Sequence, residues 1–283
     1  MIFSGLTKIR DPFVLRGQDA YYLYGTDVSA GWEDSYWVCY KSPRLEGPWT
    51  FLYKVEPPAD AVKHRWAPEV HAYQGAYYLF GTYYSEKLAH RGCAIFQSDS
   101  PEGPFRPHSD GVITPATWDA IDGTLYVDEE GTPWMVFVHE WTSTADQVGT
   151  MAVAKLSADL RSLTSEPLEL FRADEPAWAE GHRITDGCFL YRTEQGVLQM
   201  LWSNLDHDGY CVALARSLSG RVEGPWEQEG LLYSKQTHGA DGGHGMLFRD
   251  FGGNLYLSIH SPNKGAEQPV FLPMEEYEDT LKI

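Results

Sequence analysis

The fold of this chain is decided by one stretch, Asp119–Glu140, which reads D-A-I-D-G-T-L-Y-V-D-E-E-G-T-P-W-M-V-F-V-H-E. Residues 125–127 and 134–138 are rich in aromatic and β-branched side chains, which favour strands. The segment Asp128–Gly131 between them is typical of a tight turn, because glycine adopts the positive φ that a hairpin turn needs. The stretch therefore predicts a β-hairpin with Asp122 at the start of its first strand.

The same unit of strand, polar turn and strand recurs along the whole chain. The copies occupy residues 11–26, 67–82, 122–138, 186–202 and 243–260. Marker positions 11, 67, 122, 186 and 244 at the starts of the copies lie 55 to 64 residues apart. A repeat of this length built from short strands is typical of a β-propeller. We predict an all-β protein with five blades, and one domain that spans residues 1–283.

A second repeat supports this prediction. The motif Glu-Gly-Pro-aromatic occurs at 46–49, 102–105 and 223–226, each time after an expected third strand. Proline ends strand pairing there, and the aromatic ring can pack between blades. Helix signals are weak, and only Met274–Lys282 is expected to form a short helix. The acidic segment 172–180 is expected to be a loop over the cavity or on its rim.

Composition narrows the class of function. A net charge of -18 argues against nucleic acid and anionic membranes as partners. Seventeen tyrosines, twelve phenylalanines and ten tryptophans suit both a β-rich core and a cleft that stacks on sugars. The four cysteines (Cys39, Cys93, Cys188 and Cys211) form no C-x-x-C pair, which favours free buried thiols. The N-terminal residues contain no signal-peptide pattern, so we expect a cytoplasmic protein.

Propeller geometry would gather polar residues that lie far apart in the sequence. The innermost strand of each blade runs beside the central axis, so equivalent positions converge on one mouth of the channel. These positions supply Asp11, Asp122, Asp186, His244 and the pair Pro68-Glu69. Carboxylates held close together raise one another's pKa, which costs stability. A single aspartate here would cap a turn, but three in register predict a function. Separated carboxyls with different pKa values are the chemistry of glycosidic hydrolysis, in which one activates water and another protonates the leaving oxygen.

Five short motifs, one per repeat and in this order, carry a family resemblance: Ile9-Arg10-Asp11-Pro12, Trp66-Ala67-Pro68-Glu69-Val70, Ala120-Ile121-Asp122-Gly123, Thr185-Asp186-Gly187 and Gly243-His244-Gly245. The set resembles glycoside hydrolase family 43, five-bladed propeller enzymes that act on arabinofuranosides and xylosides. The resemblance implies that Asp11 is the general base and that Asp122 tunes and orients the acid. It also implies that Trp66 forms a wall of the sugar pocket, with packing between blades as the alternative. His244 is similar to a family histidine near the axis, which in some members lies beside Ca²⁺ or another ion through water. Family members commonly invert, with base and acid roughly 6.5–9.5 Å apart.

The sequence departs from the family at the acid. The family acid is usually a glutamate in a Thr-Glu-Gly-Pro-like motif, whereas this chain has Thr185-Asp186-Gly187-Cys188. Aspartate is one methylene shorter, and a misplaced proton donor can cost about a hundredfold in rate. Three carboxyls are therefore candidates for the acid: Asp186 on register, Glu140 at the end of a strand, and Glu180 in the preceding loop. Glu140 is also a candidate acceptor for a sugar hydroxyl.

The aromatic residues Trp118, Trp141 and Trp202 fall near strand ends, where they are candidates to stack on sugar, with core packing as the alternative. Pro68, Glu69 and His244 complete the candidate substrate-binding set. We expect an inverting glycosidase that trims arabinofuranosyl or xylosyl residues from small oligosaccharides without a required cofactor. Endo action remains open. The alternatives are a non-catalytic sugar-binding propeller that has lost its acid, and a fructosidase-like hydrolase, which the absence of an N-D-P-N-like start argues against.

Overall fold

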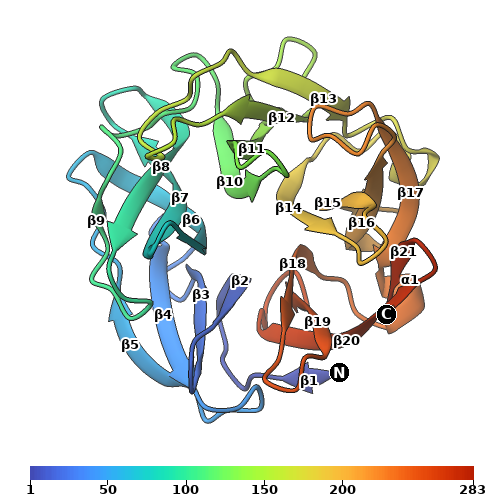
Figure 1. Cartoon of the computed structure of the whole chain (residues 1–283), viewed down its shortest axis with the longest axis horizontal. Coiled ribbons are helices and arrows are strands. Elements are labelled where there is room, and N and C mark those ends of the chain that lie inside the picture. Colours follow the sequence, from blue (N-terminus) through green and yellow to red (C-terminus); the bar gives the residue numbers. More distant parts are fainter.

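The computed structural model describes all 283 residues, and its regular secondary structure consists almost entirely of strands. Five sheets surround a central axis, as Figure 1 shows, so the predicted five-bladed propeller is confirmed. Blade one contains β2 (Ile9–Arg16), β3 (Tyr21–Asp27), β4 (Tyr36–Ser42) and β5 (Thr50–Lys54). Blade two contains β6 (Ala61–Tyr73), β7 (Ala76–Ser85), β8 (His90–Ser98) and β9 (Arg106–Pro107). Blade three contains β10 (Ala120–Val127), β11 (Pro133–His139), β12 (Thr150–Lys155) and β13 (Leu168–Arg172).

The last two blades complete the ring. Blade four contains β14 (Asp186–Arg192), β15 (Leu198–Asp206), β16 (Gly209–Ser217) and β17 (Trp226–Tyr233). Blade five contains β18 (Gly243–Arg249), β19 (Leu255–His260) and β20 (Pro269–Tyr277), followed by β1 (Ile2–Phe3) from the start of the chain. Ile2 pairs with Phe271 and Phe3 pairs with Val270, so the first strand of the chain closes the last blade.

The expected helix at Met274–Lys282 is wrong. These residues form the end of β20 and the short strand β21 (Thr280–Lys282), which pair as a hairpin. The helical segments are α1 (Lys235–His238) and the 3-10 turn η1 (Ala177–Ala179). The pairing of Glu276 with Leu281 buries the leucine at the outer edge of blade five, which a solvent-exposed helix would not do.

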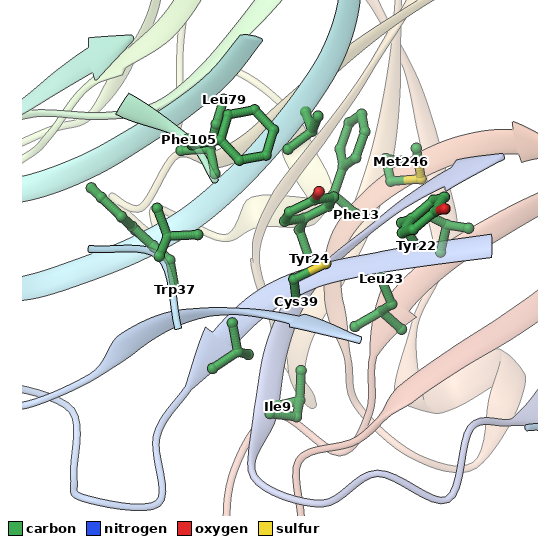
Figure 2. Packing of buried hydrophobic residues seen from close by; sticks show 14 of the residues in the cluster. Ile9, Phe13, Tyr22, Leu23, Tyr24, Trp37, Cys39, Leu79, Phe105 and Met246 are labelled. Carbon is green, nitrogen blue, oxygen red and sulfur yellow. The ribbon is translucent and has the colours of Figure 1, made fainter. Parts of the chain in front are cut away.

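The aromatic residues of the Glu-Gly-Pro motifs pack between blades, as predicted. Phe105 of blade two meets Tyr24 of blade one with ring centroids 5.9 Å apart, and Trp49 lies 6.2 Å from Phe271 of blade five. Figure 2 shows the largest cluster of the core, in which Phe105 and Leu79 of blade two lie beside Tyr24 and Trp37 of blade one. The four cysteines are buried and free, as the sequence indicated.

Every innermost strand bends at an equivalent residue in the left-handed region of φ. The five residues are Asp11, Ala67, Asp122, Gly187 and His244, with φ between 44° and 56°. At each of them the pairing with the second strand of the blade shifts register, which is a β-bulge. The expected register is therefore wrong by one residue in blade four, where Gly187 is the equivalent of Asp11. Asp186 stands one position earlier, in line with Arg10 and Trp66.

The bulges are tied together around the axis by hydrogen bonds between neighbouring blades. The amide of Ala67 donates to Oγ1 of Thr26 at 2.8 Å, and the amide of Asp122 donates to Oγ1 of Thr82 at 2.9 Å. The amide of His244 donates to Oγ of Ser203 at 2.8 Å. In each case the acceptor lies on the second strand of the preceding blade, opposite the residue before that blade's own bulge. This arrangement fixes the bulged residues at one end of the channel.

Candidate active site

A cavity of about 190 Å³ opens at the axis, on the end of the channel where the bulges lie. Its walls are formed by twelve residues: Arg10, Asp11, Trp32, Trp66, Ile121, Asp122, Glu140, Trp141, Ile184, Asp186, Tyr210 and His244. All four predicted catalytic carboxyls are among them. The ring scaffold therefore brings the three aspartates and His244 into one pocket, as the repeat pattern predicted.

Asp11 is held as a carboxylate. Its Oδ2 accepts a hydrogen bond from the hydroxyl of Thr26 at 2.7 Å, and its Oδ1 lies 3.4 Å from Nδ1 of His244. Burial alone would raise the pKa of Asp11, but the charges of His244 and Arg10 outweigh it and lower that pKa. An ionised carboxylate in a sugar-sized cavity can accept a proton from water.

His260 lies directly behind Asp11 and is neutral. The backbone amide of Asp11 donates to Nδ1 of His260 at 3.2 Å, which places the imidazole proton on Nε2, 3.4 Å from Oδ1 of Asn263. Burial and the nearby Arg10 lower the pKa of His260 well below its usual value. The same Oδ1 accepts from Nη2 of Arg10 at 2.9 Å. Asn263 thereby holds both side chains in place beside the base.

Asp186 has the opposite electrostatic setting. Burial, together with the charge of Asp122, raises its pKa to about 7, although His244 opposes the change. The hydroxyl of Tyr210 donates to Oδ2 of Asp186 at 3.0 Å. A carboxyl whose pKa is near 7 is protonated often enough at neutral pH to act as a general acid.

Asp122 is the third aspartate of the cavity. Its Oδ2 accepts from the backbone amide of Gly187 at 2.9 Å and lies 3.8 Å from Nδ1 of His244. Burial raises the pKa of Asp122 well above its usual value, and the charges of Asp11, Glu140 and Glu69 add to the effect. Two carboxyls coupled in this way titrate as a pair, so their apparent pKa values belong to Asp122 and Asp186 together.

Glu140 is engaged by a guanidinium. Oε2 of Glu140 accepts from Nε of Arg91 at 2.7 Å, and the same Arg91 lies 3.1 Å from Oδ2 of Asp119. Burial raises the pKa of Glu140, and the Arg91 charge opposes that change. Because one oxygen is occupied by Arg91, this arrangement suits Glu140 to accept a hydrogen bond from a sugar hydroxyl.

Three tryptophans form the aromatic wall of the pocket. Trp66 is mostly buried, stacks on His64 at 4.4 Å, and lies 4.9 Å from the ring of Trp32. Trp66 therefore takes both predicted positions, since it lines the pocket and also packs against Trp32 of the neighbouring blade one. Trp32 is 47% exposed and Trp141 is 38% exposed, and both line the cavity.

Several predicted positions lie outside the pocket. Trp202 is fully buried between Phe171 and Trp178, and its indole donates to Gln228, so it is a core residue and not a sugar platform. Its side chain lies on the face of β15 that packs in the core, and not on the face toward the channel. Trp118 stacks on His139 at 3.8 Å and likewise does not line the cavity.

Three further predicted residues do not reach the cavity. Pro68 and Glu69 are buried below it, where Oε2 of Glu69 lies 3.0 Å from Nε2 of His71. They come after the bulge of β6, which directs them away from the cavity. Glu180 is an exposed residue whose nearest ionic partner is His207 at 3.5 Å, so it is not placed to be the acid. No residue of the acidic segment 172–180 lines the cavity.

Sequence reasoning missed five lining residues: Arg10, Trp32, Ile121, Ile184 and Tyr210. Arg10 lies inside the Ile9–Pro12 motif, where its position before the bulge could have indicated a role. Its guanidinium lies 4.6 Å above the ring of Trp32. Trp32 and Ile184 come from connecting segments, and Tyr210 comes from the third strand of blade four, so the repeat of the innermost strands does not reveal them.

Comparison with known proteins identifies the family. The family model described as glycosyl hydrolases family 43 matches residues 6–275. The chain belongs to glycosyl hydrolase family 43. Among solved structures, an endo-arabinase from Bacteroides thetaiotaomicron superposes with a TM-score of 0.86 at 37% sequence identity. That match covers 100% of this chain and 99% of the other.

The curated relatives of this family 43 chain are less similar to it in sequence. It is 25% identical over 57% of its length to an extracellular exo-α-(1→5)-L-arabinofuranosidase from Cellvibrio japonicus, of which the match covers 47%. It is also 25% identical over 67% of its length to a probable arabinan endo-1,5-α-L-arabinosidase from Emericella nidulans, of which the match covers 56%. The chain thus spans about half the length of the curated relatives it matches.

The family resemblance implies an ion that lies beside His244 through water and not one that the side chains bind directly. No group of three or more histidine, cysteine, aspartate or glutamate side chains is arranged to hold a metal ion. Nδ1 of His244 lies 3.4 Å from Oδ1 of Asp11 and 3.8 Å from Oδ2 of Asp122. These residues do not fit a directly bound ion, so no catalytic step is assigned to one.

None of the helical segments has the length and apolar character of a membrane span.

Proposed function

We propose that this family 43 chain is an inverting glycosidase in which Asp11 is the general base and Asp186 is the general acid. The observation that carries the proposal is the opposite setting of the two carboxyls in one pocket. The surroundings of Asp11 lower its pKa, and those of Asp186 raise its pKa to about 7. Near neutral pH one therefore accepts a proton while the other still carries one.

The reaction follows from these two protonation states. Asp11 takes a proton from a water molecule as that water attacks the anomeric carbon of the bound sugar. Asp186 gives its proton to the glycosidic oxygen as the bond to the leaving group breaks. Attack from the face opposite the leaving group inverts the anomeric configuration. Asp122 and Asp186 titrate as a coupled pair, so ionisation of either one raises the pKa of the other, while the charges of His244 and Arg10 lower the pKa of the base.

An arabinofuranosyl residue is the substrate we propose for the pocket. The fully covering structural match at 37% identity is an endo-arabinase, and two curated relatives are described as acting on α-1,5-linked arabinose. A cavity of about 190 Å³ lies below the roughly 300–1,000 Å³ of typical ligand pockets, which suits one pentose ring. We therefore propose release of terminal residues from short arabino-oligosaccharides, with xylosides as the second substrate class.

The shorter acid has a consequence for substrate choice. Because Asp186 has one methylene fewer than glutamate, its proton lies further from a glycosidic oxygen that is bound as in other family members. Substrates with a good leaving group need little protonation, so they should be cleaved even if this distance is unfavourable. The same property separates an enzyme with a weak acid from a propeller that only binds sugar.

The test uses 4-nitrophenyl α-L-arabinofuranoside with the wild type, Asp11→Asn and Asp186→Asn. We expect Asp11→Asn to lose about 10²- to 10⁴-fold in kcat, the usual contribution of a general base. Asp186→Asn should keep most of its activity on this aryl substrate and lose it on arabinobiose. Proton NMR of the first product should show the inverted anomer. Wild-type protein that binds arabinobiose but cleaves neither substrate would instead be the sugar-binding propeller.

The cytoplasmic location stays a prediction, which fractionation of the source cells would check.

A further inference from the structure

The ring of hydrogen bonds between blades has one irregular member. In blades one, two and four the second strand supplies a hydroxyl to the bulge amide of the next blade, through Thr26, Thr82 and Ser203. In blade five the ring nitrogen of His260 does the same for the amide of Asp11. Four of the five bulge amides are therefore satisfied by a side chain at one structurally equivalent position.

Blade three has Val138 at that position. Val138 pairs with Ile121, the residue before the bulge at Asp122, as Thr26 pairs with Arg10 before the bulge at Asp11. Valine has the shape of threonine but offers no acceptor. The bulge amide of blade four, that of Gly187, is instead satisfied by Oδ2 of Asp122 at 2.9 Å.

Blade one shows what the missing hydroxyl would do. Oγ1 of Thr26 accepts from the amide of Ala67 and at the same time donates to Oδ2 of Asp11 at 2.7 Å. The hydroxyl thus stands between the carboxylate and the next blade. Asp122 has no such hydroxyl before it, so its carboxylate reaches the next blade directly and lies against the residue that follows Asp186.

We propose that Val138 is a positioning residue for the reaction: by offering no hydroxyl to the amide of Gly187, it leaves that amide to Asp122 and turns this carboxylate toward Asp186. The proposal rests on the proposed function for its kinetic readout. Two aspartates at equivalent bulges then serve different roles because of the residue opposite each of them. Thr26 bonds to Asp11 within its own blade, where Asp11 faces the cavity as the base. Val138 makes no such bond, so Asp122 is directed toward Asp186, the acid.

The groups that face these carboxyls decide the sign of the expected effect. Asp186 is influenced by Asp122, His244, Glu140 and Tyr210, and Asp122 is influenced by Asp11, Glu140 and Glu69. Among the influences on Asp186, the charge of Asp122 is the largest from another side chain, and it raises the pKa. Any change that draws Asp122 back from Asp186 lowers the higher apparent pKa of the coupled pair.

The test is Val138→Thr, which supplies the hydroxyl at nearly unchanged volume. The hydroxyl should accept from Gly187 and donate to Asp122, as Thr26 does in blade one. We expect the basic limb of kcat/KM to move to lower pH by about one unit, a typical effect of separating neighbouring charges. The matched control is Val136→Thr, because Val136 is equally buried on the same strand and in the same cluster, but pairs with Thr124 away from the bulge.

The outcomes separate cleanly. A shift in Val138→Thr that is absent from Val136→Thr supports the proposal, and an unmoved limb or an equal shift in both variants overturns it. If Val138→Thr does not fold, Val138→Ser with Val136→Ser as its control repeats the comparison. The ¹³C carboxyl resonance of Asp186, assigned by its loss in Asp186→Asn, reports the same pKa without turnover. A shift seen only in that resonance would support the positioning by Val138 and would remove Asp186 from the reaction.

Discussion

The hydrogen bond from Tyr210 to Asp186 offers the sharpest test of the electrostatic reasoning. Tyr210 is buried, and its hydroxyl donates to Oδ2 of Asp186 at 3.0 Å. Tyr210→Phe removes this donor and keeps the ring, which stacks near His260 at 5.6 Å. The donor favours the ionised form of Asp186, so its loss must raise the pKa of that carboxyl from about 7.

The size of the effect follows from the energy of the bond. A hydrogen bond to a charged group contributes about 1.5–3 kcal/mol, and about 1.4 kcal/mol corresponds to one pKa unit. We therefore expect the basic limb of kcat/KM on arabinobiose to move to higher pH by about one to two units. The acidic limb, which reports the base Asp11, should stay in place.

The assay is a pH–rate profile of wild type and Tyr210→Phe, because kcat/KM reports the ionisations of the free enzyme. Tyr233→Phe is the control, since Tyr233 is also buried and loses a hydrogen bond to Ser261, but does not line the pocket. A basic limb that stays in place or moves to lower pH in Tyr210→Phe would refute the assignment of Asp186 as the acid.

Three further predictions use other parts of the site. Thr26→Val removes the donor 2.7 Å from Oδ2 of Asp11, so the pKa of Asp11 should rise and the acidic limb of the pH–rate profile should move up by about one unit. Because the folded-state pKa of Asp186 is raised, this carboxyl lowers the stability of wild type progressively as pH rises from about 3.8 to about 7. Thermal unfolding should therefore show Asp186→Asn to gain stability relative to wild type between pH 3.5 and pH 8, by at most about 4 kcal/mol, the equivalent of a change from 3.8 to about 7. Trp32→Ala should raise KM about three- to tenfold with little change in kcat, because a stacked ring contributes about 0.5–1.5 kcal/mol to binding; an equal fall in kcat would contradict a pure binding role.

The propeller was predictable because its blades repeat. Each innermost strand carries the same start, strand and turn, and that periodicity survives in the sequence even where the residues differ. The register at Asp186 was harder, because the chain marks blade four with an Asp-Gly pair in which either residue could be the bulge. The backbone places the bulge at the second residue of this pair, Gly187, whereas the Asp122-Gly123 pair of blade three has its bulge at the first.

Residues that support the site from other strands were not predictable in the same way. Tyr210 lies on the third strand of its blade and Arg91 begins the third strand of another, positions that no repeated motif marks. For Trp202 the prediction failed in the opposite direction, because it named a residue that does not line the pocket. An aromatic residue near a strand end has the same sequence pattern whether it faces the channel or the core. Which face it takes depends on the packing of Phe171 and Trp178 from blade three and its following loop, and that packing is absent from the local sequence.

The closure of blade five by β1 also makes the pocket depend on contacts between segments that lie far apart in the sequence. The amide of Asp11 in blade one donates to His260 in blade five, and Ile2 and Phe3 pair with Phe271 and Val270. Any loosening of blade five from blade one would therefore move His244 and His260 away from the carboxylate of Asp11. The electrostatic setting of this carboxylate is thus a property of the closed ring and not of blade one alone.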